Sequence, residues 1–207
     1  MHISDGVLPT MVTLGGLAAS GGLLALSLRR LNQKDLPKVA VVTSAFFVAS
    51  LVHLPFGPTS VHLMLPGLAG ALLGPAAFLS ITLGLFLQSM LFQFGGLTAL
   101  GANALMMGLP ALVCGSLFQR LRGTTRKSHL LAGAVSGGLG ILLAGLGLAL
   151  LLASGGEDFL GVAKLALAAH VPAMLIEAAV TAATVGFLFR VKPEMLGKIR
   201  NPSEQSG

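Results

Sequence analysis

Trp and Tyr are absent from this sequence of 207 residues, and charged residues make up only 10% of it. Soluble domains contain about 25% charged residues. With 54% hydrophobic residues and a mean hydropathy of +0.88, the chain has more apolar surface than a soluble core of this size can bury. We therefore expect an integral membrane protein. Because the usual Trp and Tyr belt is missing, Phe must supply the interfacial anchoring.

Other missing features exclude several functions. The single Cys114 cannot form an intrachain disulfide, and its apolar neighbours predict a small core residue. The sequence has no Gly-x-x-x-x-Gly-Lys-Ser/Thr loop and no His-Glu-x-x-His motif. Without an ATP site of its own, the chain cannot drive primary transport alone. The start lacks a basic stretch and contains Asp5, so we expect no cleavable signal peptide.

Seven apolar segments approach the length of about 20 residues that a membrane-spanning helix needs. They are residues 8–28, 38–53, 60–73, 76–94, 97–117, 130–153 and 162–189. The third is short, and is either a half-helix or lengthened by the preceding segment; Gly74-Pro75 ends it, because Pro cannot continue a helix interior. We predict an all-α membrane bundle in which residues 1–207 form one domain.

Basic residues predict the orientation of the bundle. The net charge of +6 comes from short loops after the first, fifth and seventh segments, so we interpret it as a topology signal and expect membrane lipid, not nucleic acid, around the chain. The residues are Arg29, Arg30, Lys34, Lys38, Arg120, Arg122, Arg126, Lys127, Arg190, Lys192, Lys198 and Arg200. The positive-inside rule and an odd number of spans place the N-terminus outside and the C-terminus in the cytoplasm. His2, His62 and His170 then lie at or near the outer face.

Met1-His2 forms a potential metal chelate. The terminal amine, the His2 amide nitrogen and a His2 ring nitrogen can close adjacent rings around one divalent ion, provided that Met1 keeps a free amine. Nitrogen donors in such an array suit Ni(II), Cu(II) and, less selectively, Co(II). We expect Met1 to be retained, because His2 is too large for efficient methionine removal. The alternative is a solvated His2 without a function.

Further candidates lie in three later segments. His53 and His62 flank a turn that contains Pro55, Gly57 and Pro58, and irregular backbone of this kind can line a cavity at the membrane. Their alternative is a solvated outer loop. The other candidates are polar or ionisable groups in apolar surroundings, which support ligands, pair with other helices or lie near an ion path. They are Gln88, Asn103, His170 and Glu177.

The ordered motifs resemble those of a known family. Met-His-Ile-Ser-Asp-Gly at 1–6 resembles the Met-His-Ile-Pro-Asp/Glu-Gly opening of the CbiM/NikM family, the substrate-binding membrane subunits of cobalt and nickel energy-coupling-factor (ECF) transporters. Gly-Pro-Thr-Ser-Val-His at 57–62 is similar to that family's Gly-Thr-Ser/Thr-x-His loop, and residues 95–103 are similar to its Gly-Gly-x-x-x-Leu-Gly-x-Asn segment.

The resemblance implies a ligand set. By position, Met1, His2 and His62 hold the metal, His53 is a neighbour of the site and Asn103 supports it. Glu177 resembles a Glu that usually precedes Gly, whereas Ala178 follows it here. Phe94 stands where the family commonly has Asp or His, and Met106 stands where the family commonly has Asn. Both replacements remove polar groups near the expected site. The metal preference can differ for this reason.

The resemblance also implies the function. We expect a non-enzymatic subunit in the inner (plasma) membrane that binds Co(II) or Ni(II) as the transported substrate, without an organic cofactor. It would act with a transmembrane adaptor, two ATPase subunits and, in some assemblies, a small accessory membrane subunit, with Ala69-Gly70-Ala71 as an adaptor contact. The alternatives are a stand-alone metal channel or secondary transporter, and an intramembrane metalloprotease, for which the motifs are missing. The sequence does not separate cobalt from nickel.

Overall fold

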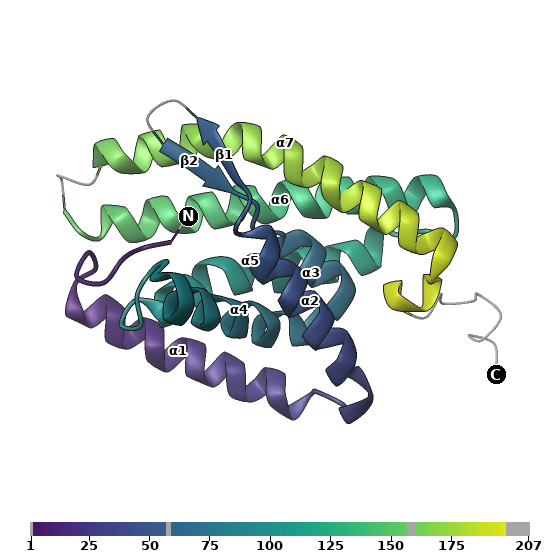
Figure 1. Ribbon diagram of the computed structural model, residues 1–207, viewed down its shortest axis with the longest axis horizontal. Coiled ribbons are helices and arrows are strands. Elements are labelled where there is room, and N and C mark those ends of the chain that lie inside the picture. Colours follow the sequence, from purple (N-terminus) through teal and green to yellow (C-terminus); the bar gives the residue numbers. More distant parts are fainter. Residues whose placement is uncertain (1, 57–58, 157–159, 198–207) are drawn as a thin grey trace.

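The computed structural model of the protein describes residues 2–56, 59–156 and 160–197. Within these ranges the chain forms a bundle of seven α-helices with one two-stranded antiparallel hairpin (Figure 1). The helices are α1 (Thr10–Arg29), α2 (Leu36–Ala49), α3 (Pro66–Leu73), α4 (Ala77–Phe92), α5 (Leu100–Leu121), α6 (Arg126–Ala153) and α7 (Leu160–Val191). The strands are β1 (His53–Phe56) and β2 (Thr59–His62), and the short 3₁₀ helices are η1 (Gln33–Asp35), η2 (Gly74–Ala76) and η4 (Pro193–Leu196).

Helix length and hydropathy do not confirm all seven expected membrane spans. Five described helical segments are long and apolar enough to cross a membrane, namely Thr10–Arg29, Pro66–Phe92, Leu100–Leu121, Arg126–Ala153 and Gly161–Val191. The segment predicted at 38–53 ends as a helix at Ala49, and α2 has only 14 residues. The segment predicted at 60–73 begins inside β2, and α3 has only 8 residues. β1 and β2 pair as an antiparallel hairpin, which hydropathy alone does not reveal.

The segment that contains α3 and α4 reverses direction at η2. The hydroxyl of Ser27, near the end of α1, donates to the carbonyl of Pro75 at 2.8 Å. The hairpin that precedes α3 and the loop that follows α4 both lie instead beside the residues that precede α1, as described below. α3 and α4 are therefore antiparallel, and the bundle has one end formed by the hairpin and the N-terminal residues and another formed by η2, the end of α1 and η4.

α5 is the central helix, and it packs against α1, α3, α4 and α6. Small residues allow this contact: a Cβ atom on Gly70 of α3 would lie 2.0 Å from the carbonyl oxygen of Ala111 in α5. Ala69 and Ala71 are also buried, so the expectation that residues 69–71 form an adaptor contact is wrong. These residues pack inside the bundle because their small size suits the close approach of α3 and α5.

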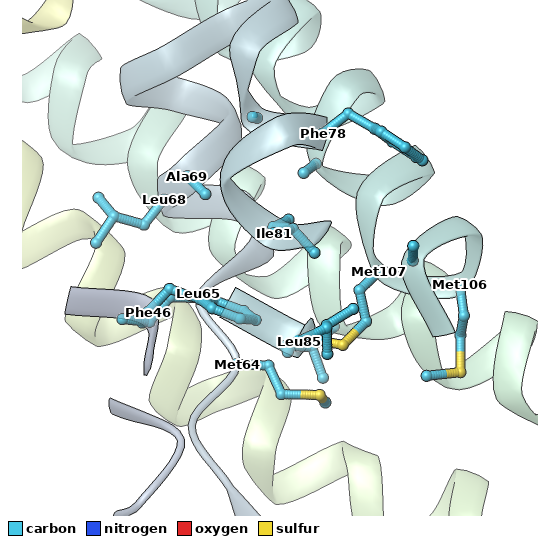
Figure 2. Close-up of a cluster of buried hydrophobic side chains, with 14 of the residues drawn as sticks. Phe46, Met64, Leu65, Leu68, Ala69, Phe78, Ile81, Leu85, Met106 and Met107 are labelled. Atoms are coloured by element: carbon cyan, nitrogen blue, oxygen red, sulfur yellow. The ribbon is translucent and has the colours of Figure 1, made fainter. Parts of the chain in front are cut away.

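α6 and α7 form the longest helix pair, and Figure 1 shows them side by side with the hairpin lying against α7. The core between α2, α3, α4 and α5 is apolar, as Figure 2 shows. Met64 and Leu65, in the link between β2 and α3, belong to this core. Because this link follows His62 directly, packing of Met64 and Leu65 fixes where the hairpin meets the bundle.

Candidate metal site

The residues that precede α1 cross the first turn of α5, and we call residues 2–6 the N-terminal strap. The Ile3 amide donates to the side-chain oxygen of Asn103 at 3.0 Å, and the Asn103 amide donates back to the Ile3 carbonyl at 2.9 Å. Both residues are buried. Asn103 therefore holds the backbone next to His2 by two hydrogen bonds.

Asp5 attaches the strap to the residues before α5. Its Oδ1 accepts hydrogen bonds from the amides of Thr98 at 3.0 Å and Ala99 at 3.1 Å, and from the Thr98 hydroxyl. These bonds, that of the hydroxyl foremost, hold the pKa of the Asp5 carboxyl below its usual value. The sequence did not single out Asp5 as a functional residue. The sequence signal for this contact is the pair of an acid near the N-terminus and a Thr just before the start of a helix, where carboxylates are favoured.

His2 and His62 meet at the hairpin end of the bundle. Their ring centroids are 4.9 Å apart, with an interplanar angle of 34°. Both ring nitrogens of His2 are buried, and burial lowers the pKa of His2 from 6.5 to about 4. Burial also lowers the pKa of His62, and repulsion from the protonated form of nearby His170 lowers it further. Both imidazoles are therefore neutral at pH 7, the form that binds metals.

The side chain of Gln88, in α4, lies next to the ring of His2. Its amide lies close enough to His2 to offset part of the effect of burial on the pKa of that ring, yet the two side chains form no well-aligned hydrogen bond. Both polar atoms of the Gln88 side chain and both ring nitrogens of His2 are buried without a hydrogen-bond partner among the described residues. Buried polar atoms are seldom left unpaired, because each costs about 1–3 kcal/mol. This pair of residues thus suits a polar ligand.

Glu177 of α7 positions the link behind His62. Its Oε1 accepts hydrogen bonds from the amides of Met64 at 2.5 Å and Leu65 at 2.8 Å, and its Oε2 accepts from Leu65 at 3.0 Å. Leu65 has a left-handed backbone, with φ of 48°, and directly precedes α3. The carboxylate therefore serves as the cap that α3 lacks in its own sequence, and it supports the site from a distance.

His170 and His53 take less direct positions. The Nδ1–H of His170 donates to the carbonyl of Ala166, one turn earlier in α7, at 2.7 Å, which leaves the lone pair on Nε2. His53 pairs with His62 across the hairpin through its backbone. The His53 side chain and the whole of Met1 lie outside the described residues. The predicted ligands that the structure brings together are thus His2 and His62.

The two departures from the family pattern lie in apolar surroundings. The Phe94 ring stacks on Phe92 at 5.8 Å between centroids, and Phe92 contacts Phe47 of α2 at 5.5 Å. Met106 is buried against Gly147 of α6. Phe94 thus packs on the end of α4, and Met106 packs α5 against α6, so apolar contacts stand where the family carries polar groups.

The described part of the chain contains no group of three or more His, Cys, Asp or Glu side chains arranged to hold a metal ion. A metal at His2 and His62 would therefore need other donors, such as backbone nitrogen, the Met1 amine or the Gln88 amide. A cavity of about 240 Å³ lies beside His2 and Ile3, walled by apolar residues of α6 and α7. On this side, apolar walls keep other polar side chains away from His2.

Comparison with known proteins places this site in context. Residues 2–195 match the family described as the cobalt uptake substrate-specific transmembrane region. A putative metal transport protein of Haemophilus influenzae is 37% identical and is matched over 97% of this chain and 99% of its own length. The fused nickel transport protein NikMN of Rhodobacter capsulatus and the cobalt transport protein CbiM of Geobacter sulfurreducens are each 34% identical, over 98% and 96% of this chain. The chain spans 66% and 62% of the length of those two relatives.

Two solved structures share the fold. A crystal structure of a transition metal transporter superposes with a TM-score of 0.73 and 28% identity, covering 94% of this chain and 95% of that one. A truncated transition metal transporter gives a TM-score of 0.71 and 27% identity, covering 94% and 99%. The similarity therefore covers most of the chain rather than a single motif.

Proposed function

Because the chain belongs to the family of cobalt uptake substrate-specific transmembrane regions, we propose that it captures Co(II) or Ni(II) between the N-terminal strap and the hairpin. In this proposal the ring nitrogens of His2 and His62, the His2 amide nitrogen and the Met1 amine bind the ion. The observation that carries it is the contact between two buried, neutral imidazoles next to the unpaired Gln88 amide.

The chemistry of these donors supports the assignment. Neutral imidazole and deprotonated amide nitrogen bind late first-row divalent ions, and four nitrogen donors in a plane favour Ni(II) over Co(II). Binding would release the amide proton and any proton on the Met1 amine. Asn103 would keep the His2 backbone in place and Glu177 would keep His62 in place, so that little ordering is needed when the ion arrives.

The orientation follows from the same proposal. Cytoplasmic basic loops after α1, α5 and α7 put the strap outside, where it meets an incoming ion. α2 would then lead outward to the hairpin and α3 inward to η2, as two short passes, since His2 and His62 lie at the same end of the bundle. A transmembrane adaptor, two ATPases and an accessory membrane subunit would supply the energy and complete the transporter, because the sequence has no P-loop.

Blocking the N-terminus tests the proposed function. Adding two Gly residues before Met1 converts the amine into an amide and removes one donor, so we expect Ni(II) affinity to fall at least about 100-fold, as on loss of a metal ligand or its support. Titration of the purified, detergent-solubilised protein with Ni(II) measures this. The matched control carries the same two Gly residues after Gly207.

Unchanged affinity after the N-terminal addition would refute the chelate, provided that the C-terminal control binds normally. Reconstitution in liposomes gives a second criterion. Rapid Ni(II) entry into liposomes that contain this chain alone, without any ATPase, would favour a stand-alone channel or secondary transporter instead.

A further inference from the structure

The strap is attached to the bundle on both sides of its backbone, at Ile3 and at Asp5. Asn103 holds Ile3 from the first turn of α5, and the amides of Thr98 and Ala99 hold Asp5 from just before that turn. The contact at Ile3 is buried, whereas the contact at Asp5 is exposed to solvent. The Asp5 contact is therefore the one that a small change can open without disturbing the core.

The carboxylate of Asp5 suits its position for two reasons. Ala99 directly precedes the first residue of α5, so its amide belongs to the unpaired N–H groups at the start of that helix, where an anion is stabilised. The Thr98 hydroxyl adds a third donor to the same oxygen, Oδ1. A carboxylate that receives three hydrogen bonds holds its position more firmly than a neutral side chain would.

The loop beneath the strap is shaped to receive this carboxylate. A Cβ atom on Gly96 would lie 1.9 Å from Oδ1 of Asp5, so any side chain there would displace it. A Cβ atom on Gly95 would lie 3.1 Å from Cβ of His2, and Gly95 has φ of +75°. The paired glycines thus let the strap lie directly on the loop backbone at both His2 and Asp5.

We propose that Asp5 is a positioning residue for metal capture. Its carboxylate binds the start of α5 rather than the ion, and thereby holds His2 against His62. This inference rests on the proposed function, because positioning matters only if the terminus binds the metal. It extends that function by naming the contact that orders the terminus before the ion arrives.

Two substitutions test the proposal. Asp5→Asn keeps the size of the side chain and removes its charge, and Gly96→Ala fills the place that the carboxylate occupies. We expect each to weaken Ni(II) binding about three- to tenfold, the usual consequence of losing a charge-assisted hydrogen bond at an exposed position. Asp35→Asn, an exposed acid on η1 at the other end of the bundle, should leave the affinity unchanged.

An effect through the terminus is distinguished from a general loss of stability by blocking Met1 and removing the His2 ring. In a chain with two Gly residues before Met1 and with His2→Ala, Asp5→Asn should cause no further decrease in Ni(II) affinity, because the strap then supplies neither the terminal amine nor the His2 ring. An equal decrease in the blocked and native chains would overturn the proposal. So would an affinity of Asp5→Asn equal to that of the unsubstituted protein.

A measurement without metal separates this inference from the proposed function. In the metal-free protein, Asp5→Asn should increase the rate at which an aminopeptidase removes Met1 and His2, with an unchanged melting temperature. If the unsubstituted chain binds no Ni(II) but this rate increases, the proposed function fails while the strap contact stands. An unchanged rate would overturn the role of Asp5 whatever the metal titration gives.

Discussion

At the scale of single residues, burial prepares the two imidazoles for a metal. An exposed His has a pKa near 6.5 and is partly protonated at pH 6. Burial lowers the pKa of His2 to about 4 and lowers that of His62 as well. The two rings can thus lie 4.9 Å apart without two positive charges repelling each other. The close approach of the two rings has a small free-energy cost only while both rings are neutral.

The lowered pKa predicts how acid affects the strap. A detached strap takes up a proton on His2 near pH 6.5, whereas the seated ring resists protonation until about pH 4. Acid therefore favours the detached state, and the stabilisation present above pH 6.5 is lost progressively between pH 6.5 and 4, by up to about 3 kcal/mol. The rate of aminopeptidase removal of Met1 from metal-free protein, measured across this range, should rise accordingly. His2→Gln has no imidazole to protonate, so its rate of Met1 removal should not rise between pH 6.5 and 4 through this effect. An equal rise in His2→Gln would show that protonation of His2 is not the cause.

At the scale of elements, the hairpin and α3 act as one unit. The register pairs His53 with His62, and the link that follows is fixed by Glu177 and by the packing of Met64 and Leu65. α3 is too short to be stable alone, since isolated helices below about 12 residues are marginal. A residue of α7 therefore controls the position of a metal-ligand candidate on β2.

Glu177→Gln tests this control. The neutral amide keeps one acceptor oxygen where the carboxylate offers two, so we expect a loss of about 1.5–3 kcal/mol in unfolding free energy and weaker Ni(II) binding. Thermal unfolding in detergent and Ni(II) titration measure the two effects. Glu194→Gln, on η4 and exposed, is the control, and it should change neither. Normal Ni(II) affinity in Glu177→Gln would show that the link does not position His62.

At the scale of the whole molecule, glycine distinguishes packed surfaces from lipid-facing ones. Gly70 meets the backbone of α5 closely, whereas nothing lies within 4 Å of a Cβ atom on Gly21 of α1. Few residues of α1 are buried, and Met11 is 83% exposed, as expected for a helix that faces lipid. Glycine thus allows close helix packing in α3, whereas in α1 a glycine lies next to open space.

Substitution of these two glycines should have opposite effects. Gly70→Ala places a methyl group 2.0 Å from the Ala111 carbonyl oxygen, and the forced separation of α3 and α5 should cost about 1–3 kcal/mol or more. Gly21→Ala meets open space and should be neutral or stabilise the helix by about 0.5–1 kcal/mol. Thermal unfolding of the two variants in the same detergent compares them. A Gly70→Ala protein as stable as Gly21→Ala would contradict the close packing of α3 and α5.

The sequence predicted most of the helices but misplaced the ends of two. α1, α5, α6 and α7 lie within a few residues of the predicted segments, because long apolar runs define their own limits. The hairpin was missed, because β1 and β2 are too short for a hydropathy pattern and are recognised only through their pairing. Residues 69–71 were misassigned to the surface, because a small-residue stretch looks the same whether it faces a partner or its own bundle.

For the site, the residue types were predictable and the contacts were not. The nitrogen donors of His2 and His62 and the membrane character of the chain follow from the sequence, since both depend on local chemistry; the ligand assignment stays a prediction. Only the tertiary structure decided that His2 meets His62, that Asn103 and Asp5 hold the strap and that Glu177 holds Met64 and Leu65. Such contacts join residues far apart in the chain, and their distances depend on how the helices pack.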